Sequence, residues 1–136
     1  MAGGRKPSRD ATTLANVSSE PNHEEATPRF CLRHLVDGFN VDALDKDGRA
    51  ALAVAMAKRA QLTWKQIKQA DRHGLGTEFI PAHQIKAPIP MHFSDSDRFM
   101  VFRYRGKLPM VGIRTGDTFH ILWVEANFDD LYAHGS

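Results

Sequence analysis

The stretch FMVFRYRGKLPMVGIRTGDTFHILWVEANF, residues 99–128, decides the fold because apolar and polar residues alternate along much of it. Alternation of this kind is typical of strands with one buried face. The stretch is interrupted at residues 106–107 and 115–117 by residues that favour hairpin turns. It therefore predicts three antiparallel strands, over 98–105, 109–114 and 118–125.

The face of the sheet on which each residue lies follows from the two turns, because cross-strand neighbours share a face. A two-residue first turn and a three-residue second loop give a core face with Met100, Phe102, Tyr104, Val111, Ile113, Phe119, Ile121 and Trp123. The opposite face then carries Arg103, Arg105, Arg114, Thr118 and His120, with Gly112 among them. A two-residue second turn would instead move His120 to the core face.

The polar face allows two interpretations. Cations that face one another repel unless an anion joins them, which favours a phosphate site. Residues 98–114 carry five Lys and Arg residues and no acid, in line with that interpretation. Arginine is also common on a solvated sheet face, so patterning alone leaves both interpretations open. Gly112 indicates that a ligand or another backbone segment approaches this face closely.

The size and composition of the chain limit the classes of protein to consider. Its 136 residues suffice for one domain, and a net charge of +2 does not by itself indicate a nucleic-acid partner. The single cysteine, Cys31, excludes a disulfide within the chain and fits a reducing cytosol. The sequence has no apolar run long enough to cross a membrane and no secretory signal, so we expect a cytoplasmic protein with no membrane partner.

Cysteine and histidine also bear on catalysis and metal binding. Cys31 with His34 nearby is a conceivable nucleophile pair, although a lone cysteine is more often a small buried apolar residue. None of the seven histidines stands at the spacing of a zinc-binding helix. We therefore expect no metal site and no cofactor.

The composition changes near residue 29. Residues 1–28 are rich in Gly, Ser, Thr, Pro and charge, which predicts a disordered N-terminal tail. Residues 29–136 are predicted to form a single domain. Within it, residues 75–97 contain three prolines and are expected to be irregular, with short edge strands around 79–80 and 84–86.

Two helices are predicted between the tail and the strands. Asp45 or Asp47 is a plausible N-cap of the first helix, whose apolar stripe contains Leu52, Ala55, Met56 and Ala60. Arg59 lies on the same side, where its stem can follow the stripe while its guanidinium reaches water.

The second helix has a clearer start. Thr63 and Gln66 have the spacing of a capping box, and Trp64 and Ile67 provide an apolar side. Gly74 is a suitable residue to follow the end of this helix. Because few residues separate the two helices, we expect an antiparallel or sharply crossed pair.

This layout, a helical pair followed by arginine-bearing antiparallel strands, resembles the RelE/ParE-like toxin superfamily of bacterial toxin–antitoxin systems over residues 42–134. The segment VFRYRG resembles the family's arginine-bearing strand, and MVGIR resembles the strand after it. The resemblance implies an α+β fold in which an N-terminal helical pair packs on a small twisted antiparallel sheet.

The resemblance also implies a metal-independent endoribonuclease that acts on ribosome-associated mRNA and is bound by a cognate antitoxin protein. It implies that Lys86, Arg103 and Arg105 bind the RNA phosphate. The catalytic residues that it implies are Arg114, His120, Tyr132 and His134. Such a reaction needs a base for the 2′-hydroxyl proton, an acid for the leaving 5′-oxygen and cations for the developing phosphate charge.

Two alternatives to the ribonuclease remain open. One is a protein-interaction module without enzymatic activity, or a toxin that inhibits a protein target. The other is a helix-turn-helix DNA-binding regulator that begins at LTWKQIKQADRHGLG, residues 62–76. The regulator needs a recognition helix after Gly74, where the sequence is broken by prolines.

Overall fold

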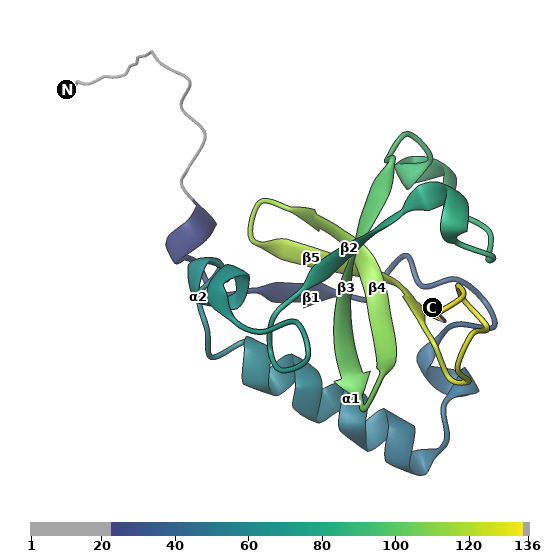
Figure 1. Cartoon of the computed structure of the whole chain (residues 1–136), viewed down its shortest axis with the longest axis horizontal. Helices are drawn as coiled ribbons and strands as arrows, with labels where there is room; N and C mark the ends of the chain where they lie inside the picture. The colour runs from purple at the N-terminus through teal and green to yellow at the C-terminus, as the bar shows by residue number, and fades with distance from the viewer. Residues whose placement is uncertain (1–22, 135–136) are drawn as a thin grey trace.

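The computed structural model describes residues 23–134 (Figure 1). Within them the chain forms helices α1 (Lys46–Arg59) and α2 (Trp64–Gln69) and strands β1 (Arg29–Cys31), β2 (Glu78–Pro81), β3 (Arg98–Arg105), β4 (Leu108–Thr115) and β5 (Thr118–Val124). The strands make one sheet in the order β1-β5-β4-β3-β2. The α+β class is confirmed. The sheet is mixed rather than wholly antiparallel, because β1 precedes the helices and pairs with β5 in parallel.

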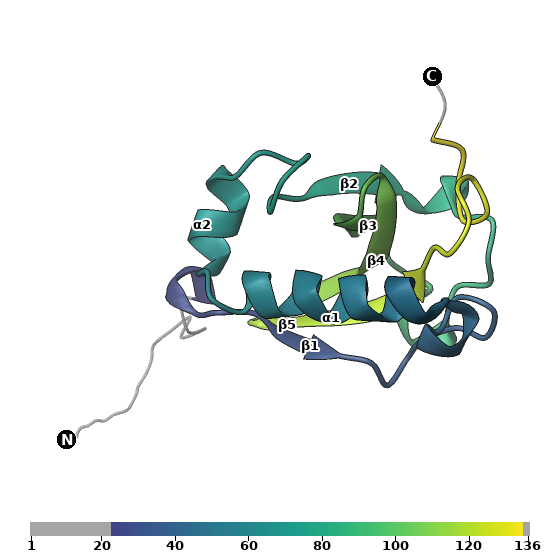
Figure 2. The same cartoon turned by 90° about the horizontal axis from the view of Figure 1, so that it is seen from below.

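Helix α1 begins at the first of the two candidate N-caps. Asp45 Oδ1 accepts a hydrogen bond from the Gly48 backbone nitrogen at 2.7 Å, which satisfies a donor at the start of the helix. Gly48, Leu52, Ala55 and Arg59 follow at helical spacing and form its buried side. Figures 1 and 2 show α1 running along one side of the sheet, with α2 at the end where residues 23–25 lie.

Helix α2 has the predicted capping box. Thr63 Oγ1 accepts from the Gln66 backbone nitrogen at 3.1 Å, and the Thr63 backbone nitrogen donates to Gln66 Oε1 at 2.9 Å. The helix buries Trp64 and Ile67. The prediction for its end is wrong, because the helix stops at Gln69 and the chain reaches Gly74 through a turn.

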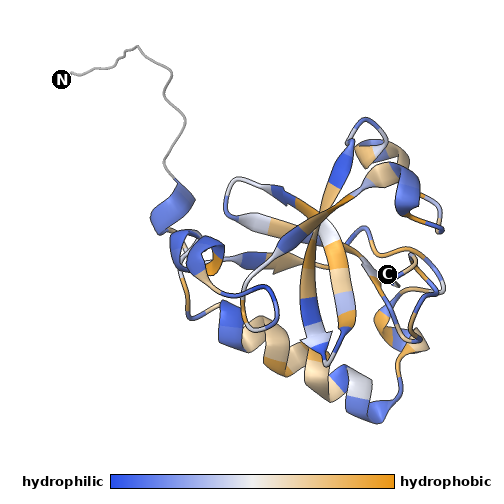
Figure 3. Cartoon of the chain, viewed as in Figure 1, coloured by the Kyte–Doolittle hydropathy of each residue, from blue (hydrophilic) through white to orange (hydrophobic). Residues whose placement is uncertain are grey.

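Both faces of the sheet are covered by apolar side chains, whereas the sequence predicts one core face. The cluster on the helix side contains Met100, Phe102, Tyr104, Met110, Phe119, Ile121 and Val124, packed on Leu52, Ala55, Trp64 and Ile67. The cluster on the opposite side contains Phe99, Val101, Val111, Leu122 and Trp123, packed on Ile80, Phe93, Leu131 and Tyr132. Accordingly, apolar colour fills the strand interiors and the middle of α1 in Figure 3.

A β-bulge at Tyr104 separates two arginines that are predicted to share a face. Arg103 pairs with Pro109 and Arg105 with Leu108, so Tyr104 has no partner on β4. The extra residue reverses the alternation. Arg103 therefore points to the face opposite the helices, while Arg105 turns towards α1.

The second turn is shorter than the three-residue loop in the predicted register. Thr115 pairs directly with Thr118, and Gly116 occupies the left-handed region with φ of 63°. His120 consequently lies opposite Ile113, on the face away from the helices, and Arg114 lies opposite Phe119 on the helix side. A further bulge at Leu122 places both Leu122 and Trp123 on the face opposite the helices.

The chain segments on either side of the sheet also pack on it. Residues 1–22 of the predicted tail lie outside the described residues, while the Trp64 backbone nitrogen donates to Ala26 O at 2.9 Å. At the other end, the Lys86 backbone nitrogen donates to Leu131 O at 2.7 Å, and Leu131 is fully buried. Neither α1 nor α2 has the length and apolar character needed to cross a bilayer.

Candidate functional site

The predicted polar face is not formed as one surface. The bulge at Tyr104 and the short turn at Gly116 place Arg103 and His120 on the face opposite the helices. Arg105 and Arg114 lie on the helix side of the sheet. The predicted site residues therefore fall into separate surroundings.

Arg105 and Arg114 are both paired with acids near the helices. Arg105 Nη1 lies 3.1 Å from Oδ1 of Asp45, the N-cap of α1. Arg114 Nη2 lies 3.1 Å from Glu24 Oε2, and the Arg114 guanidinium stacks over the Trp64 ring at 4.2 Å. Each of the two guanidinium groups therefore has a carboxylate partner within the protein.

His120 belongs to a small histidine cluster. Its ring centroid lies 5.9 Å from that of His34, which stacks on His92 at 5.5 Å. His120 Nε2 lies 2.8 Å from Thr115 Oγ1, and its Nδ1 is buried without a hydrogen-bond partner. Burial lowers the pKa of His120, and the neighbouring His34 and His92 lower it further.

Three of the predicted residues do meet, at a cavity of about 290 Å³ that we call the Arg103 cavity. Arg103 from β3 lines it together with Tyr132 and His134 from the C-terminal segment. Its remaining lining includes Arg72 from the turn after α2 and Glu78 from β2, the one acid among the lining residues. The site is thus assembled from three separate parts of the chain.

The Arg103 cavity has an excess of positive charge. Arg72 Nη1 lies 3.3 Å from Glu78 Oε1, and Arg103 Nη2 lies 3.6 Å from Glu78 Oε2. One carboxylate therefore faces two guanidinium groups, each of which carries a full charge at neutral pH. An anion that entered between the two arginines would balance this charge.

Both guanidinium groups also contact the ring of His73. Its Nδ1 lies 2.7 Å from Arg103 Nη1, and its Nε2 lies 3.3 Å from Arg72 Nε. A neutral imidazole has only one acceptor nitrogen, so His73 cannot satisfy both guanidinium donors. At least one of these two arginine donors therefore has no acceptor on His73.

His134 is held in one orientation. Its Nε2 lies 2.7 Å from Oε1 of Glu125, which is fully buried and also accepts from the Leu131 backbone nitrogen at 2.7 Å. The ring stacks on Tyr132 and Phe128 at 4.1 and 4.2 Å. When Glu125 is ionised it can only accept, so Nε2 donates to it and Nδ1 is then the nitrogen that can accept a proton.

The surroundings of Tyr132 keep its phenol protonated. Burial raises the pKa of its phenol, the carboxylates of Glu78 and Glu125 raise it further, and Arg103 opposes them. The hydroxyl therefore stays protonated at neutral pH. Burial also raises the pKa of Glu125, although the hydrogen bond from Leu131 and the contact with His134 act in the opposite direction.

Lys86 lies outside this cavity. Its Nζ donates to the backbone oxygen of Asp129 at 2.8 Å, so it holds the C-terminal segment. Within residues 23–134 no three His, Cys, Asp or Glu side chains are grouped so that they could hold a metal ion.

Patterns in the sequence do not indicate Arg72, His73, Glu78 or Glu125 as site residues. The first three lie near the irregular segment after α2, and no spacing indicates that this segment lies beside β3. Glu125 gives one signal, because it follows the apolar run of residues 121–124 without a turn residue between them. An acid in that position can continue a buried strand.

Comparisons with known proteins do not identify a relative. The chain matches no protein-family model, no curated protein and no solved structure.

Proposed function

We propose that the chain is a metal-independent endoribonuclease that cuts mRNA at the Arg103 cavity, in the manner of RelE-like toxins. The observation that carries the proposal is the meeting of Arg72, Arg103, Tyr132 and His134 at one cavity. These groups supply the cations, the acid and the base that cleavage without a metal requires. The order of elements, a helical pair before strands β2 to β5, also supports a RelE-like arrangement.

The roles follow from the surroundings of each group. Arg72 and Arg103 bind the oxygens of the scissile phosphate and stabilise the negative charge that grows on them. His134 Nδ1 takes the proton of the ribose 2′-hydroxyl, while Glu125 stabilises the imidazolium that forms. Tyr132 protonates the 5′-oxygen as the bond from phosphorus to that oxygen breaks. The products are a 2′,3′-cyclic phosphate and a 5′-hydroxyl.

Induced expression in a bacterium tests this proposal. The wild type should arrest growth and fragment the cellular mRNA, and the variants Arg103→Gln and His134→Asn should do neither. Loss of an acid–base group should slow cleavage roughly 10²- to 10⁴-fold. The exposed residues Arg33 and His83 provide matched controls, because Arg33→Gln and His83→Asn should act as the wild type. Intact RNA in the wild-type culture, or full activity in the two cavity variants, would refute the proposal.

One observation favours a second candidate, a module that binds a protein and has no enzymatic activity. Arg105 and Arg114 each have a carboxylate within 4 Å, so neither of them needs an external phosphate to be neutralised. Toxicity that survives the simultaneous replacement of His120, Tyr132 and His134 would support this candidate.

The helix-turn-helix alternative is less favoured, since strand β2 follows α2 where a recognition helix is required.

A protein partner belongs to the same proposal. RelE-like toxins are held inactive by a small antitoxin, so we include a cognate antitoxin as an expected partner of this chain. Copurification of such a protein with the full chain from its own host is the direct check.

A further inference from the structure

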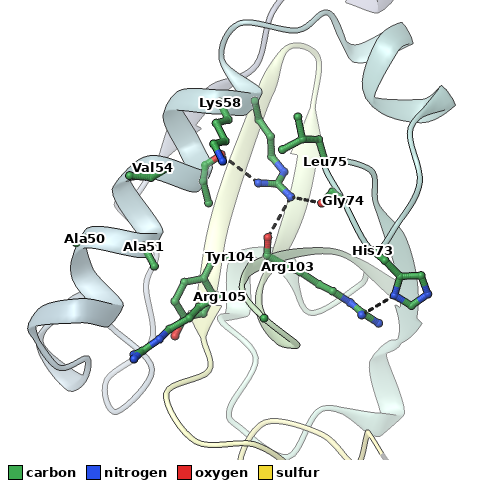
Figure 4. Close-up of a pocket in the computed structure, with 13 residues that line it drawn as sticks. Ala50, Ala51, Val54, Lys58, His73, Gly74, Leu75, Arg103, Tyr104 and Arg105 are labelled. Atoms are coloured by element: carbon green, nitrogen blue, oxygen red, sulfur yellow. Dashed lines mark hydrogen bonds between the residues drawn. The ribbon is translucent and has the colours of Figure 1, made fainter.

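A second and larger cavity, of about 760 Å³, lies between α1 and β3 (Figure 4). We call it the α1–β3 cavity. Its floor is made by small and aliphatic side chains, among them Ala51, Val54, Ala55 and Leu75. Ala55 is buried in the core, whereas Val54 is half exposed, so the floor is open to solvent at Val54.

Every ionisable group that lines the α1–β3 cavity and is charged at neutral pH is a cation. Lys58 and Arg59 come from α1 and Arg103 and Arg105 from β3, and the lining includes no Asp or Glu. Asp45 neutralises Arg105, whereas no carboxylate of the described residues lies within 4 Å of Lys58 or Arg59. The cavity therefore presents positive charge over an apolar floor.

Arg59 contributes a charge that water does not reach. It is only 2% exposed, and its guanidinium donates to the backbone oxygens of Ala55, Gly74 and Arg103 at 3.0–3.1 Å. Burial lowers its pKa to about 10, so it remains protonated at neutral pH. The guanidinium also lies over the Phe102 ring, 5.0 Å from its centroid. A buried cation without a carboxylate partner produces a strong local field, because little solvent screens it.

The two cavities meet at Arg103, which lines both of them. Its backbone oxygen receives the hydrogen bond from Arg59 on the α1 side, while its guanidinium faces His73 and Glu78 on the other. Figure 4 shows this side chain extending away from α1 towards His73. A polyanion held at Arg103 thus has the α1–β3 cavity as the next positive region.

We propose that the α1–β3 cavity binds the single-stranded RNA that leads away from the phosphate held in the Arg103 cavity. This inference rests on the proposed ribonuclease function. Lys58 and Arg105 contact the phosphates of the neighbouring nucleotides, and the floor around Val54 packs against ribose and base. A duplex would have to bring a second backbone into the space between helix and strand, so the site selects a single strand.

Binding of RNA that cannot be cut isolates this cavity from catalysis. The probes are 2′-O-methyl oligonucleotides of about two and about ten nucleotides, whose binding to the full chain is followed by fluorescence anisotropy at several salt concentrations. Val54→Asp places a negative charge on the floor, and Ala53→Asp places the same charge on an exposed neighbour outside the cavity. Lys58→Gln is matched in the same way by Lys65→Gln on the exposed side of α2.

We expect the longer oligonucleotide to bind the wild type more tightly than the shorter one. Val54→Asp should weaken binding of the longer probe by about tenfold and leave binding of the shorter probe unchanged. Lys58→Gln should weaken binding of the longer probe and lower the salt dependence by roughly one phosphate contact. Ala53→Asp and Lys65→Gln should bind both probes as the wild type does.

Three results would overturn the inference, and the first two are distinguishable from failure of the proposed function. Equal affinity of Val54→Asp and Ala53→Asp for the longer probe, with mRNA cleavage intact, removes the RNA subsite alone. An acidic amphipathic peptide that binds the wild type but not Val54→Asp, without any effect of RNA length, reassigns the cavity to a protein partner. A wild type that neither binds nor cuts RNA removes both proposals.

Discussion

At the scale of the residue, Glu78 joins the two arginines of the Arg103 cavity. Its two carboxylate oxygens lie 3.3 Å from Arg72 and 3.6 Å from Arg103, where a phosphate would bind. Glu78→Gln should therefore lower KM several-fold, because a competing charge is removed, and leave kcat within about threefold. Steady-state cleavage kinetics measure both constants. A loss of kcat of about 10² or more would identify Glu78 as the general base in place of His134.

His120 links folding stability to pH. Because burial lowers the pKa of His120 below its ordinary value of 6.5, the folded protein binds fewer protons near that pH than the unfolded chain does. The free energy of unfolding therefore decreases as the pH falls through about 6.5. His120→Phe removes the titrating group and fits among the rings of His34, His92 and Phe93. Thermal unfolding between about pH 7.5 and pH 5.5 should show a smaller decrease in Tm for this variant than for the wild type. His83→Phe, which is exposed, should show the wild-type decrease, and parallel curves for His120→Phe and the wild type would contradict this account.

Gly112 is a residue whose close contact, but not its contacting group, could be predicted from the sequence. Its position inside a predicted strand indicates close approach by a ligand or by backbone. In the structure the approaching group is the backbone of β5, since a Cβ at Gly112 would overlap the carbonyl of His120. The sequence indicates the close contact but not its identity, because both explanations require the same missing side chain.

At the scale of the element, Arg59 joins three segments. Its guanidinium donates to Ala55 in α1, to Gly74 in the turn after α2 and to Arg103 in β3. The expectation that this guanidinium reaches water is wrong, because β3 and the turn close over it. Arg59→Met keeps the stem but removes the three hydrogen bonds to these carbonyls, so it should lower the free energy of unfolding by roughly 3 kcal/mol.

Chemical denaturation measures the effect of the Arg59 change. The adjacent Lys58→Met is the control, since Lys58 is exposed and has no such partners, and its effect should stay within about 0.5 kcal/mol. If Arg59→Met were as stable as the wild type, the three hydrogen bonds would not hold these segments together.

The positions of the helices and strands along the chain were more predictable than the faces of the sheet on which their side chains lie. The sequence gives the capping box of α2 and the places of β3, β4 and β5, because these depend on local patterns. It does not give the bulge at Tyr104 or the choice between two and three residues at the second turn. Both turn lengths contain Gly116, and a shift of one residue moves every later side chain to the other face.

At the scale of the whole molecule, apolar segments cover the face of the sheet that was expected to be polar. The residues available for function are consequently those at strand ends, turns and the C-terminal segment. Arg103, Tyr132 and His134 could be selected from the sequence by residue type and resemblance. Arg72, Glu78 and Glu125 could not be selected in this way, because their positions at the site depend on which distant segments the fold brings together.

The chemistry of the RNA ends is the most direct test of metal-independent cleavage at the Arg103 cavity. Messenger RNA, both free and in a translation extract, is incubated with the purified full chain and with the His134→Asn variant, and the new ends are identified. Because the 2′-oxygen attacks phosphorus in the proposed reaction, we expect the wild type to leave a 2′,3′-cyclic phosphate and a 5′-hydroxyl. We expect the variant to leave the RNA uncut. Fragments with a 5′-phosphate, or no fragments in either mixture, would contradict it.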